Sequence, residues 1–146
     1  MHAITLPTID VDIPDAGLTI GQVARVTGLS VQALRFYERE GLMLDPTRRD
    51  PSGHRRYGRH DMEWINGLLM LRETGMSIGD MRVLADLSRR EGSEAERLRV
   101  LEEHRQSVLD VLTRTHRHLA ALQTKIDAYR DVVEHRATLQ NEKRIK

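Results

Sequence analysis

The chain has 146 residues, of which 31% are charged and only 3% aromatic, so there is room for one modest domain and an extension but little material for a large core. It contains no cysteine, which excludes disulfides, thiolate metal sites and a cysteine nucleophile. The N-terminus has neither a basic start nor a long apolar run, so we expect a cytoplasmic protein without a signal peptide or membrane span.

The net charge of +1 conceals an uneven distribution of charge along the chain. Residues 1–17 carry three acids and no Lys or Arg, whereas residues 18–60 carry eight Arg against four acids. The planar guanidinium of Arg suits phosphates and base edges. A basic block is more often a solvated face than a binding site, so charge alone does not decide in favour of nucleic acid.

Residues 1–17 are predicted to form a flexible acidic arm. Ile9, Val11 and Ile13 alternate with aspartates between two prolines, a pattern that also suits pairing with a neighbouring strand. The alternative is a tail without a role.

Two short helices are predicted next. The first begins at a capping box, in which the Thr19 hydroxyl accepts a backbone N–H and the Gln22 side chain reaches back. Gly28 supplies a turn, and Ser30 caps a second helix that runs to about Arg39. Two short helices separated by a tight turn are typical of a helix-turn-helix.

The second of these helices has two chemically different sides. Successive residues point about 100° apart, so Tyr37 falls near the inward side of Leu34 and Phe36 falls opposite. The outward side carries Gln32, Arg35, Phe36 and Arg39. Such a side on a second helix suits the major groove of DNA, with arginines on phosphates and the glutamine near a base edge. The alternative is that Phe36 packs under the following hairpin.

Residues 45–57 contain two Pro, one Gly and four Arg, which predicts a loop or a short hairpin. If the segment is extended, Arg55 and Tyr57 share one side. They would then form a basic and aromatic pair that holds a backbone phosphate. A helix-turn-helix followed by a basic hairpin is a winged helix.

Three further helices follow, over 59–74, after Ser77, and after Ser93, where Glu96 completes a capping box. The last, over 93–137, has apolar residues at coiled-coil spacing for about five heptads. A helix of about 45 residues is roughly 65 Å long and cannot bury this seam on itself. We predict a homodimer, with folding back on the chain's own domain as the alternative, and a polar tail over 138–146. The predicted dimerisation residues are Leu98, Leu101, Val108, Leu112, Leu119, Leu122, Ile126, Tyr129 and Val133.

Three segments, LTIGQVARVTGLSVQALRFYEREGL, RRDPSGHRRYGRHD and LRETGMSIGDMRVL, resemble the MerR family of bacterial transcription regulators over about residues 18–88. The resemblance implies a mainly α fold, with a winged helix-turn-helix domain over 18–88 and a long helix that pairs antiparallel with its twin. It implies a homodimer on double-stranded promoter DNA whose spacer between the polymerase elements is too long. Family members bend and untwist that spacer so that RNA polymerase engages, usually after an inducer binds the C-terminal part.

The family's Leu-Arg-Tyr-Tyr signature places its Arg on Arg35 and its second Tyr on Tyr37, while Phe36 replaces the first Tyr and lacks its hydroxyl. The wing motif Gly-Tyr-Arg-x-Tyr matches Gly53, Arg55 and Tyr57, with His54 in place of a Tyr. The predicted DNA-binding residues are Arg25, Ser30, Gln32, Ala33, Arg35, Phe36, Tyr37, Arg39, His54, Arg55 and Tyr57. Residues 96–105 also resemble a stretch of short family members, some of which sense electrophiles through a cysteine that this chain lacks.

The sequence contains no convergent nucleophile and base, glycine-rich phosphate loop or metal-ligand spacing, so we expect no enzyme activity, cofactor or metal. His116 and His118 point about 160° apart on one helix, which favours solvated histidines over a site shared between chains. Trp64 is assigned to the core rather than to a ligand platform, and no inducer is predicted. Two other functional classes remain, a DNA-bending architectural or excisionase-like protein and a coiled-coil module that binds proteins.

Overall fold

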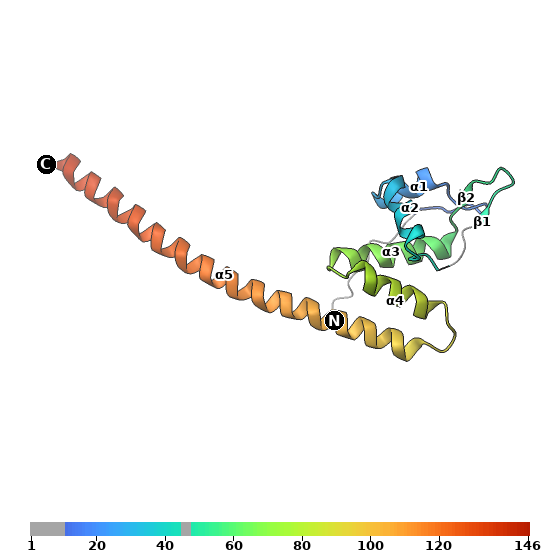
Figure 1. Cartoon of the computed structure of the whole chain (residues 1–146). Coiled ribbons are helices and arrows are strands. Elements are labelled where there is room, and N and C mark those ends of the chain that lie inside the picture. Colours follow the sequence, from blue (N-terminus) through green and yellow to red (C-terminus); the bar gives the residue numbers. More distant parts are fainter. Residues whose placement is uncertain (1–10, 45–47) are drawn as a thin grey trace. The chain divides into compact units, whose positions relative to one another are not determined.

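The computed structural model describes residues 11–44 and 48–146. The elements are α1 (Ile20–Thr27), α2 (Val31–Arg39), β1 (Arg48–Arg49), β2 (Arg55–Arg56), α3 (Arg59–Glu73), α4 (Ile78–Ser88) and α5 (Glu94–Ile145) (Figure 1). The chain divides into two compact units, and the second comprises Arg105–Lys146, within α5. The predicted mainly helical fold, with a helix-turn-helix, a wing and a long C-terminal helix, is confirmed. None of the described helices is long and apolar enough to cross a membrane.

The helix-turn-helix forms through the local signals that the sequence predicted. Thr19 and Gln22 make the capping box: the Gln22 backbone amide donates to the Thr19 hydroxyl at 3.2 Å, and the Thr19 backbone amide donates to the Gln22 side-chain Oε1 at 2.9 Å. Gly28 ends α1 at a φ of 75°. The Ser30 hydroxyl then accepts from the Ala33 amide at 3.0 Å and begins α2. Each start is therefore fixed by a contact within four residues.

The predicted hairpin is an antiparallel pair in which Arg48 lies opposite Arg56 and Arg49 opposite Arg55. Asp50 closes its turn, because the Ser52 and His54 amides donate to the Asp50 carboxylate at 2.9 and 3.0 Å. The His54 amide is the main cause that holds the pKa of Asp50 below its ordinary value. The ionised Asp50 carboxylate therefore stabilises the turn at neutral pH, and this stabilisation is lost as the pH falls through the lowered pKa.

The helices α1, α2, α3 and α4 share one hydrophobic core. Trp64 packs against it, and its Nε1 donates to the Leu42 carbonyl at 2.7 Å, so the assignment of this ring to the core is confirmed. The core cluster contains Leu18, Val23, Leu29, Leu34, Tyr37, Leu42, Met43, Tyr57, Met62, Ile65, Leu68, Leu71, Met76, Met81 and Leu84.

The described part of the predicted arm, residues 11–17, is attached to this domain rather than free. Ile13 packs against the core. The Leu18 amide and carbonyl pair with those of Tyr57 at 2.8 and 2.9 Å, which joins the end of the arm to the wing. Residues 1–10, which include Ile9, lie outside the described residues.

Gly17 is where the arm meets the wing, and replacing it by Ala is expected to destabilise the domain by about 3 kcal/mol. Its φ is 79°, and an added Cβ would lie 2.9 Å from the Tyr57 carbonyl oxygen. Backbone strain of about 1–2 kcal/mol and overpacking of about 1–3 kcal/mol therefore add. Gly28→Ala is the control, because Gly28 has a φ of 75° and nothing within 4 Å. Urea unfolding of both variants gives the steric part as their difference, and equal losses would contradict the close approach.

The structure corrects two expectations about the long helix. It continues to Ile145, so the polar residues from 138 onward extend α5 beyond the predicted boundary at 137. Ser93 is buried, and its hydroxyl donates back to the carbonyls of Leu87 and Arg90 rather than forming the predicted capping box. The reason is that α4 ends in a tight connection, where the carbonyls of Leu87 and Arg90 need a hydrogen-bond donor that the helix itself does not supply.

Candidate DNA-binding surface

A groove of about 930 Å³ lies between α2 and the wing. It brings together the two segments that the sequence analysis identified separately. Its lining residues are Thr19, Ile20, Arg35, Glu38, Arg39, Arg49, Asp50, Gly53, His54, Arg55 and Arg56. Five of these are arginines and two are acids, so the groove is positively charged and suited to an anionic backbone.

The division of α2 into two sides is confirmed. Leu34 and Tyr37 are buried in the core, at 2% and 5% exposure. Phe36 is 37% exposed, so it does not pack under the hairpin as the alternative required. Its ring centroid lies 6.0 Å from that of Tyr37. The exposed residues of α2 are Gln32, Arg35, Phe36 and Arg39.

The arginines of the groove fall into two groups. The side chains of Arg35 and Arg39 have no hydrogen bond or ion pair to any residue in the described part of the chain. The wing arginines, in contrast, have internal partners: Arg49 donates to the Gly53 carbonyl at 2.7 Å, Arg56 lies 3.3 Å from Asp50, and Arg55 pairs with Glu38. The guanidinium groups of Arg35 and Arg39 are therefore available to phosphates, while the wing arginines are held in position by the protein.

Tyr57 does not lie on an outward side of the wing, which corrects the expected role of this ring. It is 2% exposed and part of the core, and burial raises its pKa. Arg55 is half-buried as well, because the side of β2 that carries it faces α2 instead of solvent. Tyr37 and Tyr57 therefore support the surface from beneath.

The remaining predicted residues occupy different places around the groove. Arg25 is exposed in the last turn of α1 but does not line the groove. Ser30 is occupied as the cap of α2, and Ala33 is half-buried. His54 is exposed at the hairpin turn. Arg49 and Arg56 also line the groove and were not among the predicted residues, although two Arg-Arg dipeptides on either side of one turn were a signal for them.

The segment that follows α2 is held by side chains from α3 and α4. Arg89 donates to the carbonyls of Gly41 at 2.6 Å and Leu44 at 3.0 Å, and also to that of Met43. Arg82 donates to the Glu40 carbonyl at 2.9 Å and pairs with its carboxylate. With Trp64 on Leu42, five consecutive carbonyls from 40 to 44 each have a side-chain donor. We call Trp64, Arg82 and Arg89 the clasp; it fixes the end of α2 relative to the rest of the domain.

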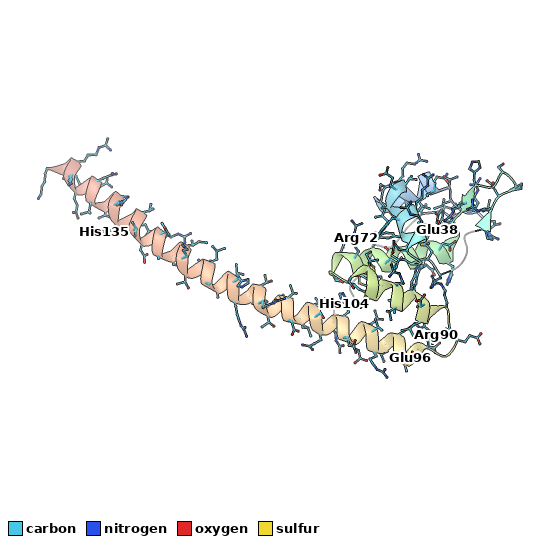
Figure 2. The ribbon with its side chains drawn as sticks, viewed as in Figure 1. Glu38, Arg72, Arg90, Glu96, His104 and His135 are labelled. Carbon is cyan, nitrogen blue, oxygen red and sulfur yellow. The ribbon has the colours of Figure 1, made fainter. Side chains whose placement is uncertain are left out.

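Arg35→Ala is expected to weaken binding to all DNA sequences similarly and to reduce the salt slope by about one per subunit, because each phosphate contact contributes about 0.9 to that slope. Arg72→Ala is the control, since Arg72 is an exposed arginine on α3 outside the groove (Figure 2). Titrations at several salt concentrations measure both slopes. An unchanged slope with altered base preference would assign Arg35 to base reading.

The predicted seam of α5 is uncovered in the single chain. The helix buries none of its residues. Eight of the nine predicted dimerisation residues are 40–65% exposed, and Val108 is half-buried. Isolated apolar residues on a surface are ordinary, but a row of this length, broken only by Arg105, Thr115 and Arg136, indicates an interaction surface.

No three His, Asp or Glu residues gather at a metal-binding distance within residues 11–44 and 48–146. His104, on the first part of α5, makes a contact with the end of α3. Its Nε2 lies 2.7 Å from the Thr74 hydroxyl, which itself donates to the Leu71 carbonyl at the end of α3.

Relatives of known sequence share this domain. Residues 18–88 match the family described as MerR HTH family regulatory protein. An uncharacterised HTH-type transcriptional regulator of Haemophilus influenzae is 33% identical over 112 residues, which span 76% of this chain and 82% of that protein. The HTH-type transcriptional regulator AdhR of Bacillus subtilis is 43% identical over 61 residues, which span 42% of this chain and 43% of AdhR.

Solved structures extend the likeness beyond the domain. A MerR family transcriptional regulator from Listeria monocytogenes superposes with a TM-score of 0.72 at 31% identity, over 77% of this chain and 86% of that one. HiNmlR, a MerR family regulator lacking the sensor domain and bound to promoter DNA, gives a TM-score of 0.68 at 32% identity, over 77% of this chain and 90% of that one. These relatives are regulators rather than enzymes. The chain therefore belongs to the MerR family of helix-turn-helix transcription regulators.

Proposed function

We propose that this regulator binds promoter DNA as a homodimer and bends and untwists the spacer between the two polymerase elements so that RNA polymerase engages. The observation that carries the proposal is the groove between α2 and the wing, where the side chains of Arg35 and Arg39 have no hydrogen-bond or ion-pair partner among the described residues. An α-helix fits the major groove, and a basic hairpin beside it reaches the adjoining backbone. The likeness to HiNmlR, which was solved on promoter DNA, supports the same use of this surface.

Phosphate and base contacts divide naturally over the surface. Arg35 and Arg39 hold phosphates, as do the wing arginines, and these contacts set position and affinity. Gln32, near the start of α2, reaches a base edge, where an amide pairs in bidentate fashion with adenine. Phe36 lies against a sugar or a thymine methyl, since it has an exposed ring and no hydroxyl.

The exposed seam of α5 supports the proposed dimer. Leaving a row of Leu, Ile and Val in water costs about 25 cal/mol for each Å² that a second helix would cover. A second copy provides a complementary row by symmetry. With antiparallel helices the two winged domains belong to opposite ends of a two-fold dimer, so the operator is an inverted repeat. The two α2 helices enter major grooves on a similar face, about 34 Å or a multiple of it apart.

Chemical footprinting on operator DNA selected from the genome tests this function. We expect hyper-reactive bases at the untouched centre of the inverted repeat, because the distorted steps lie there. Replacing flexible central steps by a stiff A-tract is expected to weaken binding although no contacted base changes. Uniform protection at the centre, together with indifference to the A-tract, would leave a DNA-binding dimer without the distortion. In vitro transcription from the same site tests the effect on polymerase.

A further inference from the structure

Glu38 is an acidic residue in a groove whose charged residues are mainly arginines, and its partner lies on the opposite wall of that groove. Glu38 belongs to α2, the helix proposed to enter the major groove (Figure 2). Its carboxylate pairs with Arg55 of the wing. The two side chains are shielded to a similar degree, at 22% and 27% exposure. The other acid of the groove, Asp50, binds the amides of its own turn and pairs with Arg56 of the same hairpin, so its partners all belong to the wing. Glu38 is thus the carboxylate that spans the groove from the helix to the wing.

We propose that Glu38 is a specificity-determining residue, which occupies Arg55 in the free protein and releases or shares it only when a duplex fits both α2 and the wing. This inference rests on the proposed binding of DNA. A cation already paired within the protein contributes little to a loose complex, because it neutralises no additional phosphate. The carboxylate also repels any phosphate that approaches out of register.

A well-fitted complex escapes this penalty. A guanidinium has five N–H donors, so Arg55 can donate to a phosphate and keep some contact with Glu38 when the backbone lies in one orientation. Arg55 then counts as a phosphate contact in the specific complex but not in nonspecific ones. Selection against poorly fitting sites by a repulsive group is a common source of specificity.

The test compares Glu38→Gln with Glu40→Gln on an operator and on unrelated DNA. Glu40 provides a matched control, because it lies two residues away, pairs with an arginine, Arg82, and does not line the groove. Each variant loses one negative charge and one ion pair. Glu38→Gln is expected to tighten nonspecific binding about tenfold and to steepen its salt slope by about one per subunit. Its specific slope should remain near that of the wild type, so the ratio of specific to nonspecific affinity falls.

Arg55→Gln supplies an independent test if Glu38→Gln folds poorly, which thermal melting of each variant reveals. It is expected to lower the salt slope of operator binding by about one per subunit and to leave the nonspecific slope unchanged. Equal losses on both DNAs, or identical behaviour of the Glu38 and Glu40 variants, would overturn the inference. Failure of the wild type to bind any DNA in a salt-dependent manner would instead overturn the proposed function itself.

Discussion

Replacing Leu122 by Lys is expected to convert the proposed dimer into monomers at micromolar concentration. Leu122 is 54% exposed in the single chain and occupies a core position of the predicted seam near the middle of α5. In an antiparallel pair it faces apolar side chains, and an unpaired buried charge costs several kcal/mol. The cost is incurred once per subunit, which is enough to dissociate many dimers. Sedimentation velocity over a range of concentrations measures the result.

Thr124→Lys is the control for this experiment. Thr124 lies two residues further along α5, about 200° around the helix from Leu122 and therefore on the outer side. The same charge there should leave the dimer intact. If the Leu122 variant remains a full-strength dimer, the register of the seam is wrong. If both variants dissociate, the effect comes from net charge rather than from the seam.

Replacing Arg89 by Met is expected to destabilise the domain by about 3 kcal/mol, because hydrogen bonds from a charged donor contribute about 1.5–3 kcal/mol each and exposed carbonyls regain water in part. Arg89, at the end of α4, donates hydrogen bonds to the carbonyls of Gly41, Met43 and Leu44. Met keeps most of the aliphatic stem, so little of the loss comes from packing. The substitution also removes the ion pair of Arg89 with the exposed Asp86, but such a pair contributes only about 0–1 kcal/mol, so most of the loss reports on the carbonyl hydrogen bonds. For a domain of this size about 3 kcal/mol lowers the Tm by roughly 10–20 °C.

The chain has one tryptophan, and its fluorescence can report the loss of the Arg89 hydrogen bonds at the segment that they hold. Trp64 is bonded to Leu42, in the middle of the segment that Arg89 holds, so its fluorescence reports on the clasp during urea unfolding. Arg90→Met is the matched control, since Arg90 is 66% exposed and only 4.0 Å from Glu96. An exposed pair of this kind contributes about 0–1 kcal/mol. Similar losses for the two variants would show that the clasp does not stabilise the segment after α2.

Local chemistry alone determined much of the fold. Thr19, Ser30 and Ser77 accept backbone N–H groups three residues away, and such contacts involve only residues that are close in the sequence. The two sides of α2 follow from the helical period, so Phe36 could be placed outside and Tyr37 inside from the sequence. The row of apolar residues along α5 could also be predicted from the sequence, because it depends only on the spacing of residues within a single helix.

The tertiary structure decided which side of an element faces the domain and which distant groups meet. Strand alternation places Arg55 and Tyr57 on a common side, but only the packing of the wing against α2 buries that side. Ser93 has the sequence of a cap, yet the connection from α4 directs its hydroxyl to Leu87. Arg89 reaches carbonyls more than forty residues away in the sequence. Such pairings depend on the closure of long loops around a shared core, and no pattern within one element encodes them.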